Sequence, residues 1–166
     1  MARVLVAYGS ERGGTAEIAE WIGVALRDVG VVADVVAAAL VRDVGGYDAV
    51  IVGGSVYGYR WHRDARRLVR RYARALGERP VWLFSSGPLD NSANEHDIPP
   101  VRGARRAAER VHAREHITFG GVLRRDAKGF PAAAMAERIG GDYRDPALIR
   151  AWATAIAEAL KVGVDL

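Results

Sequence analysis

Cysteine is absent from this sequence of 166 residues, and Lys128 and Lys161 are the only lysines among 24 basic residues. The lack of cysteine excludes disulfides, thiolate metal sites and cysteine nucleophiles, and it is typical of a cytoplasmic protein. No apolar run reaches the ~18 residues of a membrane span. A strand is expected from the third residue onward, which leaves no room for a secretory signal peptide. We therefore expect a cytoplasmic protein.

The composition is that of a globular protein with one core, and we expect a single domain over residues 1–166. Half of the residues are hydrophobic and the net charge is +4, with a pI near 9.8. A basic balance of this size is compatible with an anionic ligand, an acidic partner or an anionic membrane surface. Codon bias toward Arg, Ala, Gly and Val would produce the same excess, so the charge is informative only where it clusters. No set of His, Asp and Glu residues has the spacing of metal ligands.

Short apolar blocks alternate with segments of helical periodicity along the chain, and this predicts an α/β fold with a five-stranded parallel sheet covered by helices on both faces. In such sheets, ligands bind beyond the carboxyl ends of the strands. We therefore expect loops 9–14, 54–62 and 86–97 to share one site. Segment 123–143 is expected to be irregular, with one helical turn around 132–138. The expected strands are 3–8, 31–36, 49–53, 81–85 and 117–119, and the expected helices are 15–29, 63–74, 103–114 and 147–160.

The turn after the first strand has the composition of an anion site. Residues 9–15 read Gly-Ser-Glu-Arg-Gly-Gly-Thr, and a helical pattern begins directly after them. Backbone N–H groups converge at a helix start, its dipole favours negative charge, and glycines let the main chain approach a ligand. We interpret the turn as a phosphate site for a mononucleotide, with Gly13 at a position too crowded for a side chain. The alternative is an ordinary turn in which Ser10 or Thr15 caps the helix.

Residues 8–15 resemble the phosphate loop of the flavodoxins, in which a hydroxyl residue, two variable residues, Gly, one residue and Thr follow at this spacing. The resemblance implies a flavodoxin-like three-layer sandwich with sheet order 2-1-3-4-5 and a bound FMN, although a deazaflavin would make similar contacts. Arg12 stands where the family usually has a hydroxyl residue, and it would either pair with the phosphate or face solvent. The implied phosphate-binding residues are Ser10, Glu11, Arg12, Gly13, Gly14 and Thr15.

The same resemblance implies that the second and third loops hold the flavin ring. Tyr57, Tyr59 and Trp61 could each stack on the isoalloxazine, and we prefer Tyr57 because it is nearest to the strand end. Gly58 can change its backbone conformation without a steric penalty, and amides of the third loop could bind the pyrimidine end of the ring. The expected ring contacts are Ser55, Val56, Tyr57, Gly58, Tyr59, Ser86, Gly87 and Leu89.

Further segments resemble the quinone-dependent protoporphyrinogen IX dehydrogenases of the flavodoxin superfamily. They are residues 53–59, Trp61-His62-Arg63, 119–121 and 140–141, and segment 123–143 is similar to the extra loop of such enzymes. This resemblance implies an FMN-dependent oxidoreductase that oxidises protoporphyrinogen IX or a related small anionic substrate, with a quinone as acceptor. His62 and Arg63, at the mouth of the expected site, are the candidate catalytic residues. The alternative is that they belong to the solvated arginine face of helix 63–74.

Other functions remain as alternatives at this point. A flavodoxin that carries electrons between redox proteins would have the same site, but such carriers are typically acidic. A binding module that has lost its flavin is disfavoured by the intact Gly13 and Thr15. Nucleic-acid binding is disfavoured because no recognisable motif accompanies the arginine-rich helix. That helix leaves peripheral membrane association and a redox partner protein open, and the sequence predicts no oligomeric state.

Overall fold

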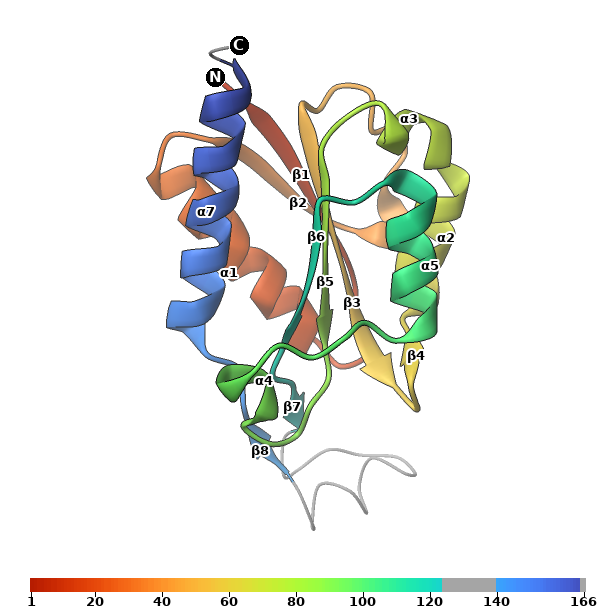
Figure 1. The fold of residues 1–166 in the computed structure, drawn as a ribbon, viewed down its shortest axis with the longest axis vertical. Helices are drawn as coiled ribbons and strands as arrows, with labels where there is room; N and C mark the ends of the chain where they lie inside the picture. The colour runs from red at the N-terminus through yellow and green to blue at the C-terminus, as the bar shows by residue number, and fades with distance from the viewer. Residues whose placement is uncertain (124–139, 165–166) are drawn as a thin grey trace.

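A parallel sheet forms the middle layer of the molecule (Figure 1). The computed structural model describes residues 1–123 and 140–164, so the helical turn expected around 132–138 lies outside the described residues. The parallel strands are ordered β2-β1-β3-β5-β6, and this confirms the predicted order 2-1-3-4-5. Their bounds are β1 Arg3–Gly9, β2 Val32–Ala37, β3 Ala49–Tyr57, β5 Val81–Ser86 and β6 Glu115–Phe119.

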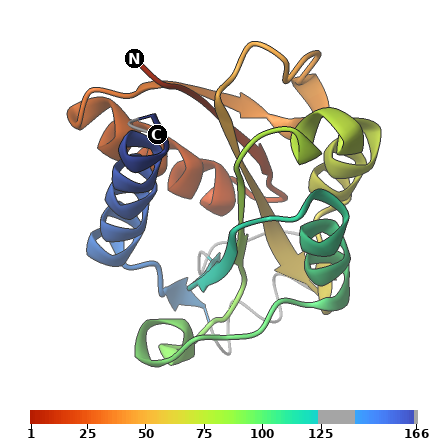
Figure 2. The ribbon, with the colours of Figure 1, turned by 45° about the horizontal axis from the view of Figure 1, so that its top comes forward.

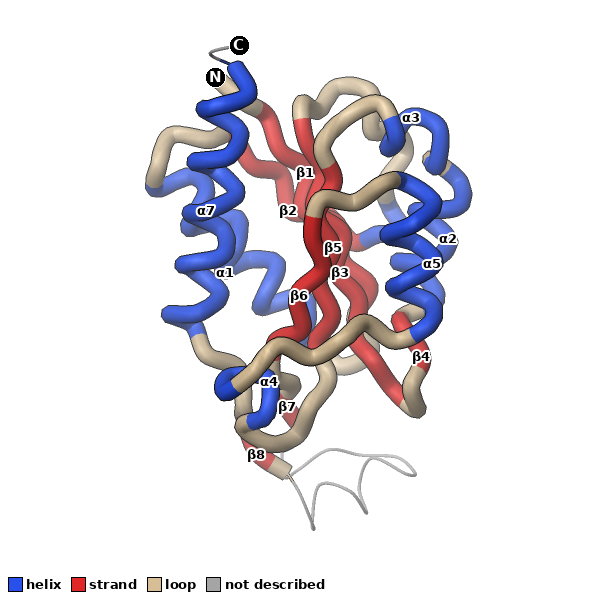
Figure 3. The backbone as a smooth tube through the Cα atoms, in the orientation of Figure 1, coloured by secondary structure: helices blue, strands red, loops and turns tan. Residues whose placement is uncertain are grey.

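Helices cover both faces of this sheet, as Figures 2 and 3 show. One face carries α1 (Gly14–Asp28) and α7 (Pro146–Val164), and the other carries α2 (Arg63–Arg71), α3 (Ala73–Gly77) and α5 (Arg102–Val111). No helix within residues 1–123 and 140–164 is long and apolar enough to cross a membrane. The remaining short elements are η1 Ala38–Leu40, β4 Arg60–Trp61, α4 Ser92–Glu95, β7 Val122–Leu123 and β8 Gly141–Asp142.

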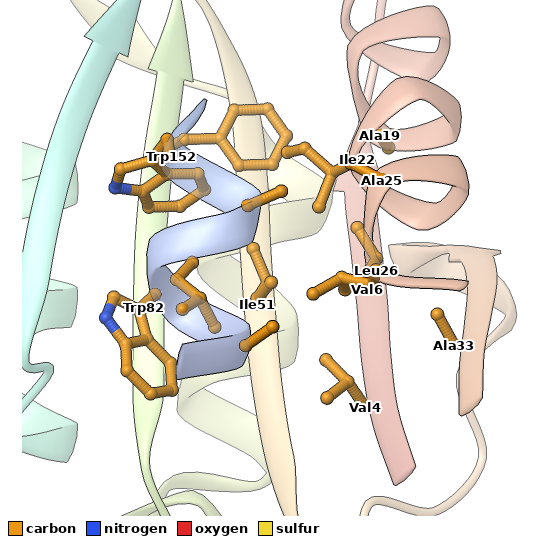
Figure 4. Close-up of a cluster of buried hydrophobic side chains, with 14 of the residues drawn as sticks. Val4, Val6, Ala19, Ile22, Ala25, Leu26, Ala33, Ile51, Trp82 and Trp152 are labelled. Carbon is orange, nitrogen blue, oxygen red and sulfur yellow. The ribbon is translucent and has the colours of Figure 1, made fainter. Parts of the chain in front are cut away.

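Alternating apolar residues divide the core between the two faces of the sheet. Val4 and Val6 of β1 are buried against α1 and α7, whereas Leu5 and Ala7 are buried against α2 and α5. This is the two-residue periodicity of a strand that is covered on both sides. Figure 4 shows the cluster on the α1 and α7 side, with Trp152 of α7 among its members.

Aromatic packing explains one of the glycines of β3. The ring of Phe84 lies edge-on to Trp152, with 6.2 Å between ring centroids. A Cβ atom added at Gly53 would lie 1.9 Å from the Phe84 ring. Gly53 therefore makes room for this ring in the centre of the sheet and does not serve loop flexibility.

Two boundaries differ from the sequence prediction. Strand β3 continues to Tyr57 and pairs with β4, so the expected loop 54–62 is mostly a β-hairpin. The expected helix 63–74 is interrupted at Tyr72, which has φ −109° and separates α2 from α3. The Tyr72 hydroxyl donates a hydrogen bond to the Val41 carbonyl at 3.1 Å, and this anchors the interruption. Helical periodicity continues across the break and so did not reveal it.

Candidate cofactor site

The loops at the carboxyl ends of β1, β3 and β5 enclose one cavity of about 660 Å³, here called the cofactor cavity. Sheet topology predicted this convergence. All of the expected cofactor-binding residues except Gly13 line the cavity. They are Ser10, Glu11, Arg12, Gly14, Thr15, Ser55, Val56, Tyr57, Gly58, Tyr59, Ser86, Gly87 and Leu89.

The phosphate turn ends where α1 begins, and its backbone is shaped by one glycine. Gly13 is the N-cap of α1 with φ +88°, a left-handed conformation, and its N–H donates to the Ser10 hydroxyl at 3.0 Å. The first N–H groups of any helix have no acceptor within the helix. Those of α1 start at Gly14, and both Gly14 and the buried Thr15 line the cavity. The turn therefore presents backbone donors to the cavity.

The reason expected for Gly13 is wrong, because a Cβ atom there would have no heavy atom within 4 Å. Its left-handed φ, which L side chains rarely adopt, is what favours glycine. Crowding occurs one residue later, since a Cβ atom at Gly14 would lie 2.4 Å from Cγ1 of Val122. The two glycines therefore serve different purposes, conformation at residue 13 and close packing at residue 14.

Arg144 binds the first turn of α1. Its guanidinium donates to the Gly14 carbonyl at 3.1 Å, pairs with Asp142 at 2.8 Å and Glu17 at 3.3 Å, and stacks on Trp21 at 4.6 Å. The side chain is only 4% exposed. The hydrogen bonds that Arg144 donates to the carboxylate of Asp142 raise the pKa of Arg144, so it stays charged. The sequence did not reveal the contact between Arg144 and the start of α1, because Arg144 and Gly14 lie 130 residues apart in the chain.

The β3–β4 hairpin brings two tyrosines to the mouth of the cavity. Tyr57 is 48% exposed and Tyr59 is 89% exposed. Gly58 and Tyr59 both have positive φ, 56° and 61°, as a two-residue hairpin turn of type I′ requires. Trp61 is wrong as a stacking candidate, because it is fully buried and its Nε1 donates to the Phe84 carbonyl at 3.2 Å.

The loop after β5 is held by bonds to the end of β6. The Ser86 hydroxyl donates to the Gly120 carbonyl at 3.3 Å, and the Gly87 N–H donates to the Phe119 carbonyl at 3.3 Å. The structure therefore uses the Gly87 amide within the protein and does not leave it for a flavin oxygen, contrary to our expectation. Leu89 also lines the cavity, and its backbone amide remains a candidate to bind the pyrimidine end of the flavin ring.

His62 and Arg63 do not line the cavity, but Nε2 of His62 lies 3.6 Å from the carboxylate of Glu11, which does line it. His62 is the N-cap of α2, and its Nδ1 accepts a hydrogen bond from the Asp64 N–H at 3.1 Å. Its ring also covers Gly9, where a Cβ atom would lie 2.6 Å from Nδ1. The structure gives His62 a helix-capping position and Arg63 an exposed one, and their catalytic role stays a prediction.

Residues at the ends of β5 and β6 and in the segments that follow these strands complete the cavity, and sequence reasoning missed them. Ser85 and Thr118 line it, and the Ser85 hydroxyl shares a 2.7 Å hydrogen bond with Nε2 of His116. Burial lowers the pKa of His116 to about 4, so the ring is neutral near pH 7. Strand adjacency was the available signal, since β6 lies next to β5. The other added lining residues are Pro88, Ile98, Pro99, Val101, Gly121, Val122 and Leu123.

Comparison with known proteins identifies the family of the chain. The sequence matches the family model described as "Flavodoxin domain" over residues 5–139. The chain belongs to the flavodoxin domain family. That membership implies a flavin as its cofactor, although the structure carries no ligand. A search of curated proteins found none that matches the chain.

Solved structures show the same fold at low sequence identity. Oxidised flavodoxin 2 from Bacillus cereus superposes with a TM-score of 0.60 at 20% identity, over 95% of this flavodoxin domain and 99% of that chain. A mutant flavodoxin from Pseudomonas aeruginosa superposes with a TM-score of 0.61 at 16% sequence identity, over 96% of this chain and 99% of that chain. Rubredoxin oxygen:oxidoreductase from Desulfovibrio gigas superposes with a TM-score of 0.65 at 15% sequence identity, over 99% of this chain. The domain spans only 37% of that chain.

The residues of the cavity fit a flavin nucleotide. The volume lies within the roughly 300–1,000 Å³ of small-molecule sites. One end has the donors of a helix start, the mouth has an aromatic side chain, and the wall between them includes Val56, Ile98 and Leu123. Among the described residues, no three His, Asp or Glu side chains gather as metal ligands would.

Proposed function

We propose that this flavodoxin domain binds FMN in the cofactor cavity and functions as a redox protein. The observation that supports this most strongly is one continuous cavity between the donors at the start of α1 and the exposed Tyr57. When bound, FMN supplies one- and two-electron redox chemistry. The contribution of the protein is to bind, orient and shield that group.

Each wall of the cavity has a separate task in this proposal. The amides at Gly14 and Thr15 and the guanidinium of Arg12 receive the phosphate, because helix starts and arginine both favour anions. Tyr57 provides a flat surface for the ring. The apolar residues Val56 and Ile98 exclude water from its sides.

A titration that compares FMN with riboflavin tests the proposal. FMN should lose fluorescence on binding, and riboflavin, which lacks the phosphate, should bind at least about tenfold more weakly because it cannot use the charge-assisted bonds at α1. Equal affinity for the two compounds would remove the role of the phosphate turn. Absence of FMN binding, or a preference for a phosphorylated deazaflavin, would contradict the cofactor assignment.

We further propose that the domain oxidises a small anionic substrate with a quinone as electron acceptor, protoporphyrinogen IX being the named example. The net charge of +4 and the pI near 9.8 support an anionic substrate. The segments similar to the quinone-dependent dehydrogenases point to the same class. Turnover of protoporphyrinogen IX with a menaquinone analogue, measured anaerobically with FMN-loaded protein, is the direct test.

The alternative is an electron carrier that shuttles electrons between redox proteins. It is supported by the match over 99% of the length of the Bacillus cereus and Pseudomonas aeruginosa flavodoxins. A turnover rate at background, together with fast reduction by a reductase and electron delivery to a heme protein, would favour the carrier and overturn the substrate proposal.

A further inference from the structure

A second hollow of about 630 Å³ lies between α2, α5 and the β3–β4 hairpin, and we call it the arginine groove. The residues between its arginines are apolar, aromatic or glycine, Val69 and Ala107 among them, and none of the described residues in its wall is Asp or Glu. Six arginines line it, Arg60 from the hairpin, Arg66 and Arg70 from α2, and Arg102, Arg106 and Arg110 from α5.

The helical repeat produces this convergence. Residues four apart lie on the same face of a helix, so Arg102, Arg106 and Arg110 form one row on α5. Arg66 and Arg70 form a second row on α2, which packs against α5. Two rows of arginines from different helices thus face one hollow. A codon bias toward arginine explains their number but not this shared orientation.

These charges have no carboxylate partner in the part of the chain that the structure describes. Within residues 1–123 and 140–164, no ion pair is formed by any of the six arginines, while Arg3, Arg144 and Arg150 all have carboxylate partners. Six positive charges gather here in a chain whose net charge is +4. Like charges that gather on one surface repel one another, and this repulsion lowers the stability of the folded protein.

One arginine of the groove is held in place by the fold. Nε of Arg66 donates to the Trp61 carbonyl at 3.0 Å. The aliphatic stem of Arg66 lies over Gly103, where a Cβ atom would come within 3.1 Å of its Cδ. Gly103 thus leaves space for this side chain, so the floor of the groove is built around a fixed guanidinium.

We propose that the arginine groove is a binding site for a small, multiply charged anion that carries at least two carboxylate or phosphate groups. Arginine can donate two parallel hydrogen bonds to one carboxylate or phosphate group, which lysine cannot, and all the basic residues among the described lining of the groove are arginines. A hollow of this volume suits a small ligand. A membrane surface or a nucleic-acid duplex would instead contact a broad, open surface.

The groove adjoins the cofactor cavity. Gly58 and Tyr59, at the tip of the hairpin, line both hollows. A ligand in the groove therefore touches the hairpin that also borders the cavity, which would place an anionic substrate beside the redox site. This last step rests on the proposed function, whereas anion binding in the groove does not.

Calorimetric titration of FMN-free protein with tripolyphosphate and with citrate tests the binding site. The double variant Arg70→Gln/Arg106→Gln removes two charges from the groove. The matched control Arg67→Gln/Arg105→Gln removes two exposed charges from the same helices outside it. We expect at least about tenfold weaker binding of the anions to the groove variant and little change in the control. Circular dichroism verifies that both variants are folded.

Several results would overturn the proposal. They are a failure of both anions to bind, an equal loss in the two variants, and binding of phosphatidylglycerol vesicles or of an acidic peptide through the groove when neither small anion binds. Because the titration needs no flavin, its failure is distinguishable from failure of the FMN proposal. Repeating it with FMN-saturated protein tests the coupling, and a groove variant that binds FMN normally but no anion separates the two sites.

Discussion

At Gly13 the backbone enters the left-handed region immediately before α1, and the space around its Cα is open. Conformation alone therefore opposes a side chain here. We predict that Gly13→Ala lowers the free energy of unfolding by about 1–2 kcal/mol and weakens FMN binding, because the amides of the turn shift. The control is Gly77→Ala in α3, where the space is equally open and φ is not positive. Urea denaturation of both variants measures the difference, and equal stability would contradict it.

His116 makes stability depend on pH. Its pKa is about 4 in the folded protein and 6.5 in the unfolded chain, because burial disfavours the charged ring. Below pH 6.5 the unfolded state binds the proton more readily. The stabilising contribution of the neutral ring is therefore complete above pH 6.5 and is lost as the pH falls toward 4, by roughly 1–3 kcal/mol. Urea denaturation across this range should show a steeper loss for the wild type than for His116→Gln, and parallel curves would refute the assignment.

Residue roles were the hardest part to predict from sequence. Tyr57 and Trp61 are both aromatic and lie four residues apart, yet Tyr57 is half-exposed at the cavity and Trp61 is buried. The sequence placed His62 next to Arg63 as a catalytic candidate and did not reveal that it caps a helix. Burial and capping depend on which face of a short hairpin meets the core, and a pattern of aromatic and basic residues does not specify that face.

At the scale of elements, Arg144 joins the β8–α7 connection to the start of α1. We predict that Arg144→Gln lowers the free energy of unfolding by about 1–3 kcal/mol, less than for a fully buried pair because Asp142 and Glu17 are partly exposed. FMN affinity should fall as well, since the Gly14 carbonyl loses its partner. Arg150→Gln is the control, because its 2.9 Å pair with Asp28 is exposed and should contribute under about 1 kcal/mol. Thermal unfolding compares the two, and similar losses would contradict the role of burial.

The elements themselves were predictable where one face of each is buried. The five parallel strands and the helices α1, α5 and α7 follow from periodicity, with ends that differ by a few residues. The hairpin extension of β3 and the interruption at Tyr72 were not found. Both depend on contacts between distant parts of the chain, namely the burial of Trp61 and the bond from Tyr72 to Val41. Local sequence carries no record of such contacts.

For the molecule as a whole, alternation of strands and helices was enough to predict a parallel sheet and therefore the edge where loops converge, whereas the sheet order came from the resemblance to the flavodoxins. That is why the cofactor cavity could be located without a structure. The arginine groove could not, since it depends on how α2 and α5 face each other. A sequence shows that arginines recur along two helices, but only the packing of those helices shows which of them share a hollow.

A ligand that binds only the folded state stabilises the whole domain, so FMN should raise the melting temperature. At 100 times its dissociation constant the gain is about 2.7 kcal/mol, which for a chain of this length corresponds to about 5–10 °C. Differential scanning fluorimetry at one fixed FMN concentration should give a smaller shift for Gly13→Ala than for Gly77→Ala, because only the former alters the turn that receives the phosphate. Both variants carry the same Gly→Ala change, so an unequal shift reports on the site itself. An equal shift would mean that the flavin is bound without the start of α1, and the phosphate would then have to be held elsewhere.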